Sequence, residues 1–173
     1  RESFLRSELL FQTGDCLDPL RLAETERLLR SYPFIAAADV FAVPQPDGSQ
    51  HIVVYTRDEW TTRLDLGFRF DDEPWLTGIA LAEENLIGRG MLLRLFYQEH
   101  REVRDVGVEL GTPRLLNTRW DGRVGGGRTR SGVFFEEALS YPFVGEVGRV
   151  AARQSFVSRE TLFSYSIPDH SEN

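Results

Sequence analysis

The chain has 173 residues, a hydrophobic fraction of 41% and a formal net charge of −7. This length suits one domain of good size or a small domain with part of another, and the hydrophobic fraction is too high for a disordered chain. The acidic balance argues against a nucleic-acid partner, because a phosphate-binding surface needs an excess of basic charge. The single cysteine, Cys16, excludes an internal disulfide and a thiolate metal cluster.

Residues 1–58 have the pattern of an α+β unit that opens with two helices. Apolar residues at helical spacing predict the first helix over Glu2–Phe11. Asp18 and Pro19 predict the start of the second, because aspartate accepts a hydrogen bond at the N-cap and proline has no N–H to leave unpaired at the first position. This second helix is expected to run to about Ser31.

Two extended stretches follow the helices, over residues 36–43 and 50–56, and the turn residues Pro46–Gly48 separate them. We expect them to form a β-hairpin that packs on the two helices. Because a two-stranded hairpin on short helices has little core of its own, a third strand is also expected.

From about Thr61 onward the helical period disappears, and segments of alternating apolar and polar residues follow one another. In the first of them, Leu64 and Leu66 alternate with Arg63 and Asp65. Such segments joined by tight connections predict an up-and-down antiparallel meander. We expect about eight strands, near residues 62–71, 75–86, 90–99, 103–112, 116–127, 130–141, 144–156 and 159–167.

A β-sandwich, a soluble barrel and a transmembrane barrel all produce this alternation, so periodicity alone leaves the three open. The segments approach the about 9–11 residues of a tilted transmembrane strand, against about 5–6 in most soluble strands. Full charges recur on the polar face, where a barrel has a wet lumen. Aromatic residues also gather near the predicted strand ends, as in interfacial girdles: Trp75, Tyr97, Trp120, Tyr141, Phe143 and Phe156.

Four stretches in the first third of the chain form an ordered series: Arg6–Asp15, Leu22–Arg30, Tyr32–Ile35 and Thr56–Thr61. The first three resemble the last POTRA domain of the BamA/TamA superfamily of outer-membrane assembly factors (the bacterial surface antigen family). There, Leu-Leu-Phe-x-x-Gly-Asp precedes a helix with a Glu-x-x-Arg-x-Leu-Arg pattern and a hairpin. The fourth is similar to the exit from that hairpin into the barrel.

Three predicted turns extend the resemblance along the chain. Asn85, Gly88 and Gly90 lie around the end of the second predicted strand, and Pro113 and Pro142 lie between later strands. These positions are similar to the short periplasmic turns of the family. Tight turns need the positive φ that glycine allows or the fixed φ of proline.

The resemblance implies a fold and a location. Residues 1–58 would form a truncated α+β POTRA-like domain, a helix–helix–hairpin without its first strand, in the periplasm. Residues 59–173 would form a mainly antiparallel β meander, the N-terminal strands of a transmembrane β-barrel in the bacterial outer membrane. Since the family barrel has more strands than fit here, the chain resembles an internal portion of such a protein.

The resemblance also implies a non-enzymatic role in outer-membrane protein assembly, insertion or translocation. Client polypeptides would add to the exposed edge of the first hairpin strand, at Asp39, Val40, Phe41 and Ala42. Packing of Val40 and Phe41 against the core and the partner strand explains these residues equally well. The implied partners are unfolded outer-membrane protein clients, a periplasmic lipoprotein or chaperone, and outer-membrane lipid, with no nucleic acid.

The sequence offers little for catalysis. His51, His100 and His170 are scattered without metal-ligand spacing, so no metal site, cofactor or enzymatic activity is expected. The glycine-rich stretch Gly125–Gly132 is predicted to be a hairpin loop rather than a phosphate-binding loop. A second function stays open beside the first: a soluble, non-enzymatic β-rich binding module with an α+β cap.

Overall fold

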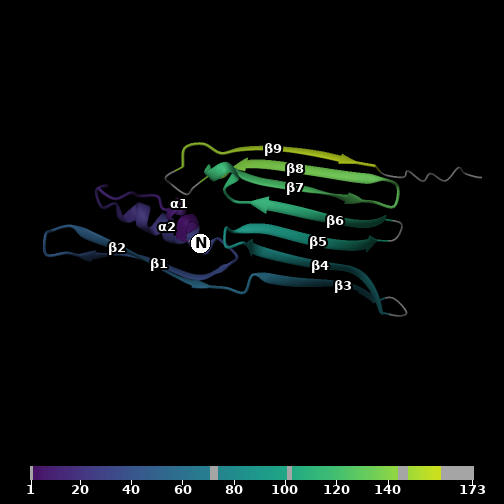
Figure 1. Cartoon of the computed structure of the whole chain (residues 1–173), viewed down its shortest axis with the longest axis horizontal. Coiled ribbons are helices and arrows are strands. Elements are labelled where there is room, and N and C mark those ends of the chain that lie inside the picture. Colours follow the sequence, from purple (N-terminus) through teal and green to yellow (C-terminus); the bar gives the residue numbers. More distant parts are fainter. Residues whose placement is uncertain (1, 71–73, 101–102, 144–147, 161–173) are drawn as a thin grey trace, which may run out of the picture.

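The computed structural model describes residues 2–70, 74–100, 103–143 and 148–160, which form two α-helices and two antiparallel sheets (Figure 1). A two-stranded hairpin lies beside the helices, and a seven-stranded sheet follows in chain order. None of the described helices is long and apolar enough to cross a membrane. The elements are α1 (Glu2–Glu8), α2 (Pro19–Arg30), β1 (Ile35–Pro44), β2 (Gln50–Asp58), β3 (Thr62–Phe70), β4 (Pro74–Leu86), β5 (Met91–His100), β6 (Val103–Thr112), β7 (Asp121–Arg128), β8 (Val133–Tyr141) and β9 (Ala152–Arg159).

The helix α2 begins and ends where the sequence predicts. Asp18 has an extended backbone, and its side chain accepts a hydrogen bond from the Leu20 N–H at 3.0 Å. Pro19 occupies the first helical position, where its missing N–H costs nothing. Ser31 is the C-cap. Local chemistry at the two caps therefore fixes this helix.

The helix α1 is shorter than predicted, since it ends at Glu8 rather than at Phe11. The chain then turns toward α2, and the Leu10 N–H donates to the Thr25 hydroxyl oxygen at 3.2 Å. Thr25 is fully buried, and its own hydroxyl donates to the Arg21 carbonyl at 2.7 Å. This buried polar group is thus satisfied while it ties the segment after α1 to α2.

The two helices pack on one face of the hairpin and form the described hydrophobic core with it: Phe4, Leu29, Phe34, Ile35, Ala38 and Val40. The other face of the hairpin leaves Phe41, Val43 and Tyr55 exposed. The expected third strand is not found in the part of the chain that the structure describes, where β1 and β2 pair only with each other.

Strands β3 to β9 form the up-and-down antiparallel meander that the alternation predicts. One strand starts later than expected, because β7 begins at Asp121 and not near residue 116. The preceding Leu115–Asn117 forms a 3-10 turn, in which Leu116 has a φ of 54°. A left-handed residue of this kind cannot continue a strand, which explains the shift.

The last described strand also differs from the prediction. The sequence predicts strands over 144–156 and 159–167, whereas β9 covers Ala152–Arg159. Strand β8 ends at Tyr141, and the antiparallel register pairs Tyr141 with Ala152, so pairing starts there. Residues 144–147 and 161–167 lie outside the described residues, and the predicted eighth strand is therefore not described.

The prediction of a glycine-rich hairpin loop is wrong for half of its residues. Gly125, Gly126 and Gly127 lie inside β7, and the turn to β8 is formed by residues 129–132. In this turn the Thr129 N–H donates to the Gly132 carbonyl at 2.9 Å. Gly127 is needed within the strand because the Val106 carbonyl and the Phe134 ring fill the space where its side chain would be.

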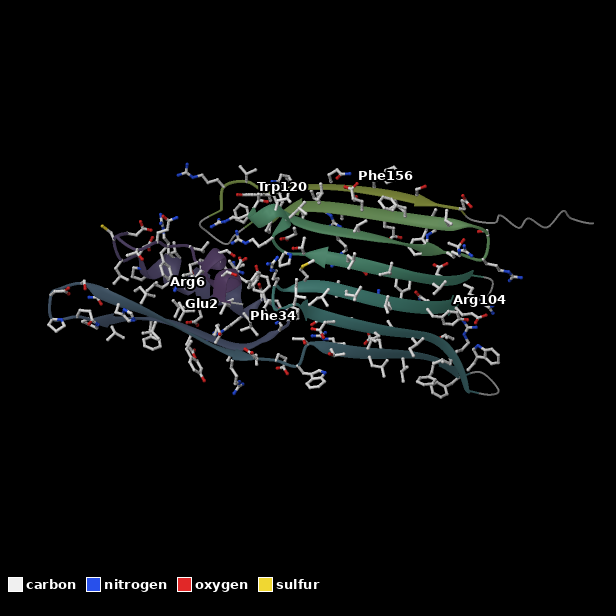
Figure 2. The ribbon with its side chains drawn as sticks, viewed as in Figure 1. Glu2, Arg6, Phe34, Arg104, Trp120 and Phe156 are labelled. Carbon is white, nitrogen blue, oxygen red and sulfur yellow. The ribbon has the colours of Figure 1, made fainter. Side chains whose placement is uncertain are left out.

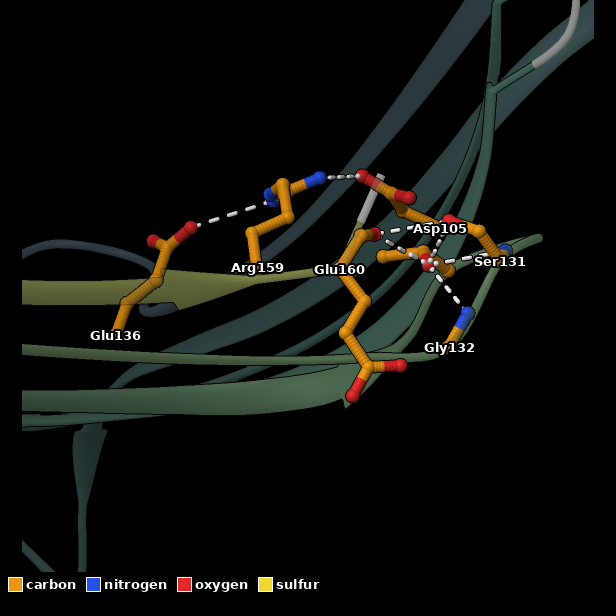
Figure 3. A network of polar contacts seen from close by, with 7 residues as sticks. Asp105, Ser131, Gly132, Glu136, Arg159 and Glu160 are labelled. Atoms are coloured by element: carbon orange, nitrogen blue, oxygen red, sulfur yellow. Dashed lines mark hydrogen bonds and ion pairs between the residues drawn. The ribbon is translucent and has the colours of Figure 1, made fainter. Parts of the chain in front are cut away.

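A contact between distant strands shows that the sheet is strongly curled across its width. Arg159 on β9 donates to Asp105 on β6 at 2.6 Å, although β7 and β8 lie between these strands (Figure 3). Three strand spacings of a flat sheet measure roughly 14 Å, which is farther than the two side chains can reach. The face that carries Arg159 and Asp105 is therefore concave, and the opposite face is convex.

Candidate functional site

The convex face of the sheet is apolar and exposed. Register pairs place Leu64 opposite Leu81, Leu81 opposite Leu95, and Leu95 opposite Val108. Directly opposed residues share one face, so this row crosses four strands on one side of the sheet. Apolar side chains on this face that are 40–60% exposed extend from β3 to β9: Leu64, Leu66, Ile79, Leu81, Leu95, Val106, Val108, Leu110, Val124, Val133, Phe135 and Phe156.

The concave face carries ion pairs. Glu109 on β6 lies between Arg94 on β5, at 3.6 Å, and Arg123 on β7, at 3.1 Å. Arg159 adds a contact to Glu136 at 3.3 Å beside its bond to Asp105. Charged groups therefore bridge β5, β6, β7, β8 and β9 on this side. The sheet thus has these ion pairs inside the curve and most of its exposed large apolar side chains outside it.

A tightly packed aromatic contact lies among these charges. The Phe134 ring lies 6.1 Å from the Phe96 ring, and the Arg159 guanidinium stacks over it at 4.8 Å. Phe134 is only 5% exposed although it is on the concave face. Gly107 and Gly127 make room for it, since a Cβ on either glycine would lie 2.7 Å from the ring.

The substitution Gly127→Ala tests this packing. A Cβ there would also lie 2.0 Å from the Val106 carbonyl oxygen, so the β6–β7 pairing has to move. We expect a loss of about 1–3 kcal/mol in the free energy of unfolding, measured by urea denaturation. Gly125→Ala in the same strand is the control, because its Cβ has no contact closer than 3.5 Å. Equal losses in both variants would contradict the packing.

A buried ion pair joins the N-terminal unit (residues 2–58) to the sheet. Arg114, in the turn after β6, donates to Glu8 at 2.5 Å, and the two side chains are 13% and 4% exposed. The same guanidinium also bonds to the Ser7 carbonyl. Burial, and then the neighbouring Glu8 carboxylate, raise the pKa of Tyr32 above its usual value, so this phenol stays protonated. The end of α1 is thereby fixed against the turn between β6 and β7.

A second contact of the same junction is apolar. The φ of Gly90, in the turn between β4 and β5, is 67°, and a Cβ there would lie 2.9 Å from the Phe34 ring. Phe34 lies where the hairpin meets the ends of the sheet strands (Figure 2). Beside it, a cavity of about 500 Å³ opens between the two units, and Tyr32, Asp121 and Arg153 are among its lining residues.

The predicted turn residues come together at this junction end. Asn85 accepts a hydrogen bond from the Gly90 N–H at 2.8 Å, and Gly88 has a φ of 69°. Pro113 follows β6 directly, and Pro142 follows β8 directly. All of these positions lie at the end of the sheet that faces the N-terminal unit.

Aromatic residues lie at both ends of the sheet. At the junction end Trp120 packs against Tyr141, with ring centroids 5.5 Å apart (Figure 2). At the opposite end Phe70 and Trp75 flank the connection from β3 to β4 and are 77% and 63% exposed. Phe156 departs from the expectation, because it lies within β9 rather than at a strand end.

The predicted client-binding residues lie on β1, the strand next to α2. Val40 is buried against the helices, Asp39 and Phe41 are exposed on the other face, and Ala42 is half-buried. Within the described residues β1 has a strand neighbour on one side only. The four residues therefore lie on an edge strand, and their role in client binding stays a prediction.

Sequence patterns do not single out the residues that join the N-terminal unit to the sheet, or those that contact the edge of β1. Glu8 and Arg114 are 106 positions apart, and no local pattern connects them. Glu26 and Arg30 contact the edge of β1, and only their i,i+4 spacing on a predicted helix offered a signal.

Comparison with known proteins adds one result. No protein-family model and no curated protein matches the chain. Among solved structures, BamA from Haemophilus ducreyi lacking POTRA domains 1-3 superimposes with a TM-score of 0.64 at 13% identity. The match covers 81% of this chain, which spans 29% of the length of that one. At such an identity the match establishes a shared fold.

Proposed function

We propose that the chain belongs to an outer-membrane β-barrel protein that assembles or translocates other outer-membrane proteins without catalytic chemistry. In this proposal residues 59–173 contribute transmembrane strands, and residues 1–58 form a POTRA-like unit in the periplasm. The shared fold with BamA supports the proposal, in which the client is an unfolded outer-membrane polypeptide.

One observation carries the proposal, namely the inverted polarity of the curled sheet. Soluble monomers rarely expose large contiguous apolar patches. Here the exposed convex face is apolar over most of the sheet, while Arg94, Glu109 and Arg123 pair inside the curve. A transmembrane barrel has this arrangement, with lipid outside and a polar lumen inside.

The outer edges of the sheet bear on the same proposal. Within the described residues β3 and β9 each have one strand neighbour. A bilayer cannot hydrogen-bond the free backbone groups of an open edge, so both edges need partner strands there. The proposal therefore includes further strands, from the same protein or from a second copy, beside β3 and β9.

Refolding from urea tests the membrane assignment. We expect the chain to form its sheet only when detergent micelles or lipid vesicles are present, and to migrate differently on a gel before and after heating. The reason is that the convex face needs an apolar solvent. A monomer that folds equally well in water, with Leu64 and Val108 protected there, would instead favour the soluble binding module.

A further inference from the structure

The free edge of β1 is covered by two side chains of α2. The Glu26 carboxylate accepts a hydrogen bond from the Val40 N–H at 3.0 Å, and the Arg30 Nε donates to the Ala38 carbonyl at 2.8 Å. Arg30 also pairs with Glu26 at 2.8 Å and with Asp39 at 3.1 Å. One acceptor and one donor from the helix thus serve the two backbone groups that flank Asp39.

These two backbone groups are the ones that an added strand would use. Alternate residues of an edge strand direct their N–H and C=O groups away from the sheet, so Ala38, Val40 and Ala42 face the same edge. β2 occupies the other edge of β1. A polypeptide that extends the hairpin at β1 must therefore bond the Val40 N–H and the Ala38 carbonyl in place of Glu26 and Arg30.

We propose that Glu26 and Arg30 form a displaceable cap on this edge, and that an extended client strand binds β1 by replacing them. This inference rests on the client recognition proposed above. The Arg30 side chain is 51% exposed and that of Glu26 is 27% exposed, so both can turn to solvent and regain hydration there. While closed, the cap protects an edge that would otherwise pair with other chains.

The surface beside the cap fits an extended segment with alternating apolar residues. Phe41 and Val43 are 48% and 37% exposed on the hairpin face that the helices leave open. Side chains of an added strand would alternate between this face and the face next to α2. Main-chain bonds would hold the client, and its apolar residues would lie beside Phe41 and Val43, which suits varied sequences.

The test compares two double variants of α2 in the full chain, folded in detergent. Glu26→Ala with Arg30→Ala removes the cap. Glu24→Ala with Arg27→Ala removes a helical pair of the same composition, joined at 2.8 Å, for which the structure shows no hydrogen bond or ion pair to the described residues of β1. The probe is a short synthetic peptide of alternating apolar and polar residues, captured by a photocrosslinker at position 42. Amide exchange at Val40 is measured in parallel without peptide.

We expect the cap variant to bind the peptide about tenfold more tightly than the wild type, because no charged hydrogen bonds have to be broken first. Its Val40 amide should exchange faster, and the control variant should match the wild type in both measurements. Unchanged exchange at Val40, or weaker peptide binding in the cap variant, would overturn the cap. Faster exchange with no peptide captured by any of the proteins would support the cap and refute client recognition at this edge.

Discussion

Arg114→Ala should lower the free energy of unfolding of the N-terminal unit by about 3–5 kcal/mol, the cost of leaving one member of a buried ion pair unpaired. The substitution leaves the Glu8 carboxylate without its partner, although that side chain is only 4% exposed. It also removes the hydrogen bond to the Ser7 carbonyl. Urea denaturation measures the loss. Limited proteolysis should show new cleavage after α1, since the junction no longer holds its end.

Arg6→Ala is the matched control for this prediction. Arg6 lies on α1, the helix that carries Glu8, and it pairs with Glu2 at 2.8 Å. Both side chains of this pair are more than 70% exposed. An exposed pair contributes no more than about 1 kcal/mol. The double change Glu8→Gln with Arg114→Gln should cost less than Arg114→Ala alone, because no buried charge is then left. Similar losses for Arg6→Ala and Arg114→Ala would show that the junction pair is not buried in the folded protein.

Val108→Arg should cost about 2–4 kcal/mol in bilayer insertion, the penalty for arginine near the midplane on the lipid side of a barrel. Val108 is 41% exposed on the convex face, in the middle of β6 and opposite Leu95. The measurement is the fraction of protein that reaches the heat-modifiable folded form in vesicles over a urea series.

The control is Gln98→Arg on the neighbouring strand β5. Gln98 is exposed on the concave face, opposite Asp105. An arginine there remains in water and gains an acidic neighbour. We therefore expect the fraction of protein that folds into vesicles to be close to that of the wild type. If Gln98→Arg blocked insertion while Val108→Arg did not, the two faces of the sheet would have the opposite roles.

Local chemistry explains which parts of the fold were predictable. The caps of α2 depend on Asp18, Pro19 and Ser31, which are neighbours of the helix in the sequence, and the prediction is confirmed. The turn at Gly88 and Gly90 needs positive φ values, which glycine signals directly. The alternation of Leu64 and Leu66 with charged residues is also a local signal. It predicts strands with one apolar and one polar face, and the antiparallel meander is confirmed.

The parts that were missed depend on contacts between distant segments. Gly125–Gly127 looked like a loop because a glycine run is a turn signal. The run is strand because it pairs with β6 and β8, and at Gly127 the Phe134 ring from β8 fills the space where a side chain would be. The predicted start of β7, near residue 116, is too early because nothing near Leu116 in the sequence signals its left-handed conformation. The Glu8–Arg114 pair and the cap on β1 exist only once helix, hairpin and sheet have assembled.

The client-binding residues illustrate the same limit in the candidate site. A family resemblance predicts Asp39, Val40, Phe41 and Ala42 as client-binding residues, and within the described part of the chain the structure places them on an edge strand next to α2. The resemblance gave no indication that the helix already bonds this edge. The cap changes the expected behaviour of the site, because binding becomes an exchange of hydrogen bonds rather than a simple addition of a strand.

The most direct test of the inverted sheet is a fluorescence scan along β6 in bilayers that contain brominated lipid. Cys16, the only cysteine, is exposed and is first replaced by serine. Single cysteines are then labelled with a fluorophore at each position from 104 to 111 except Gly107, where a Cβ would lie 2.7 Å from the Phe134 ring. We expect strong quenching at Val106, Val108 and Leu110 and weak quenching at the positions between them. Equal quenching at neighbouring positions, or none at any position, would contradict a sheet whose convex face lies against lipid.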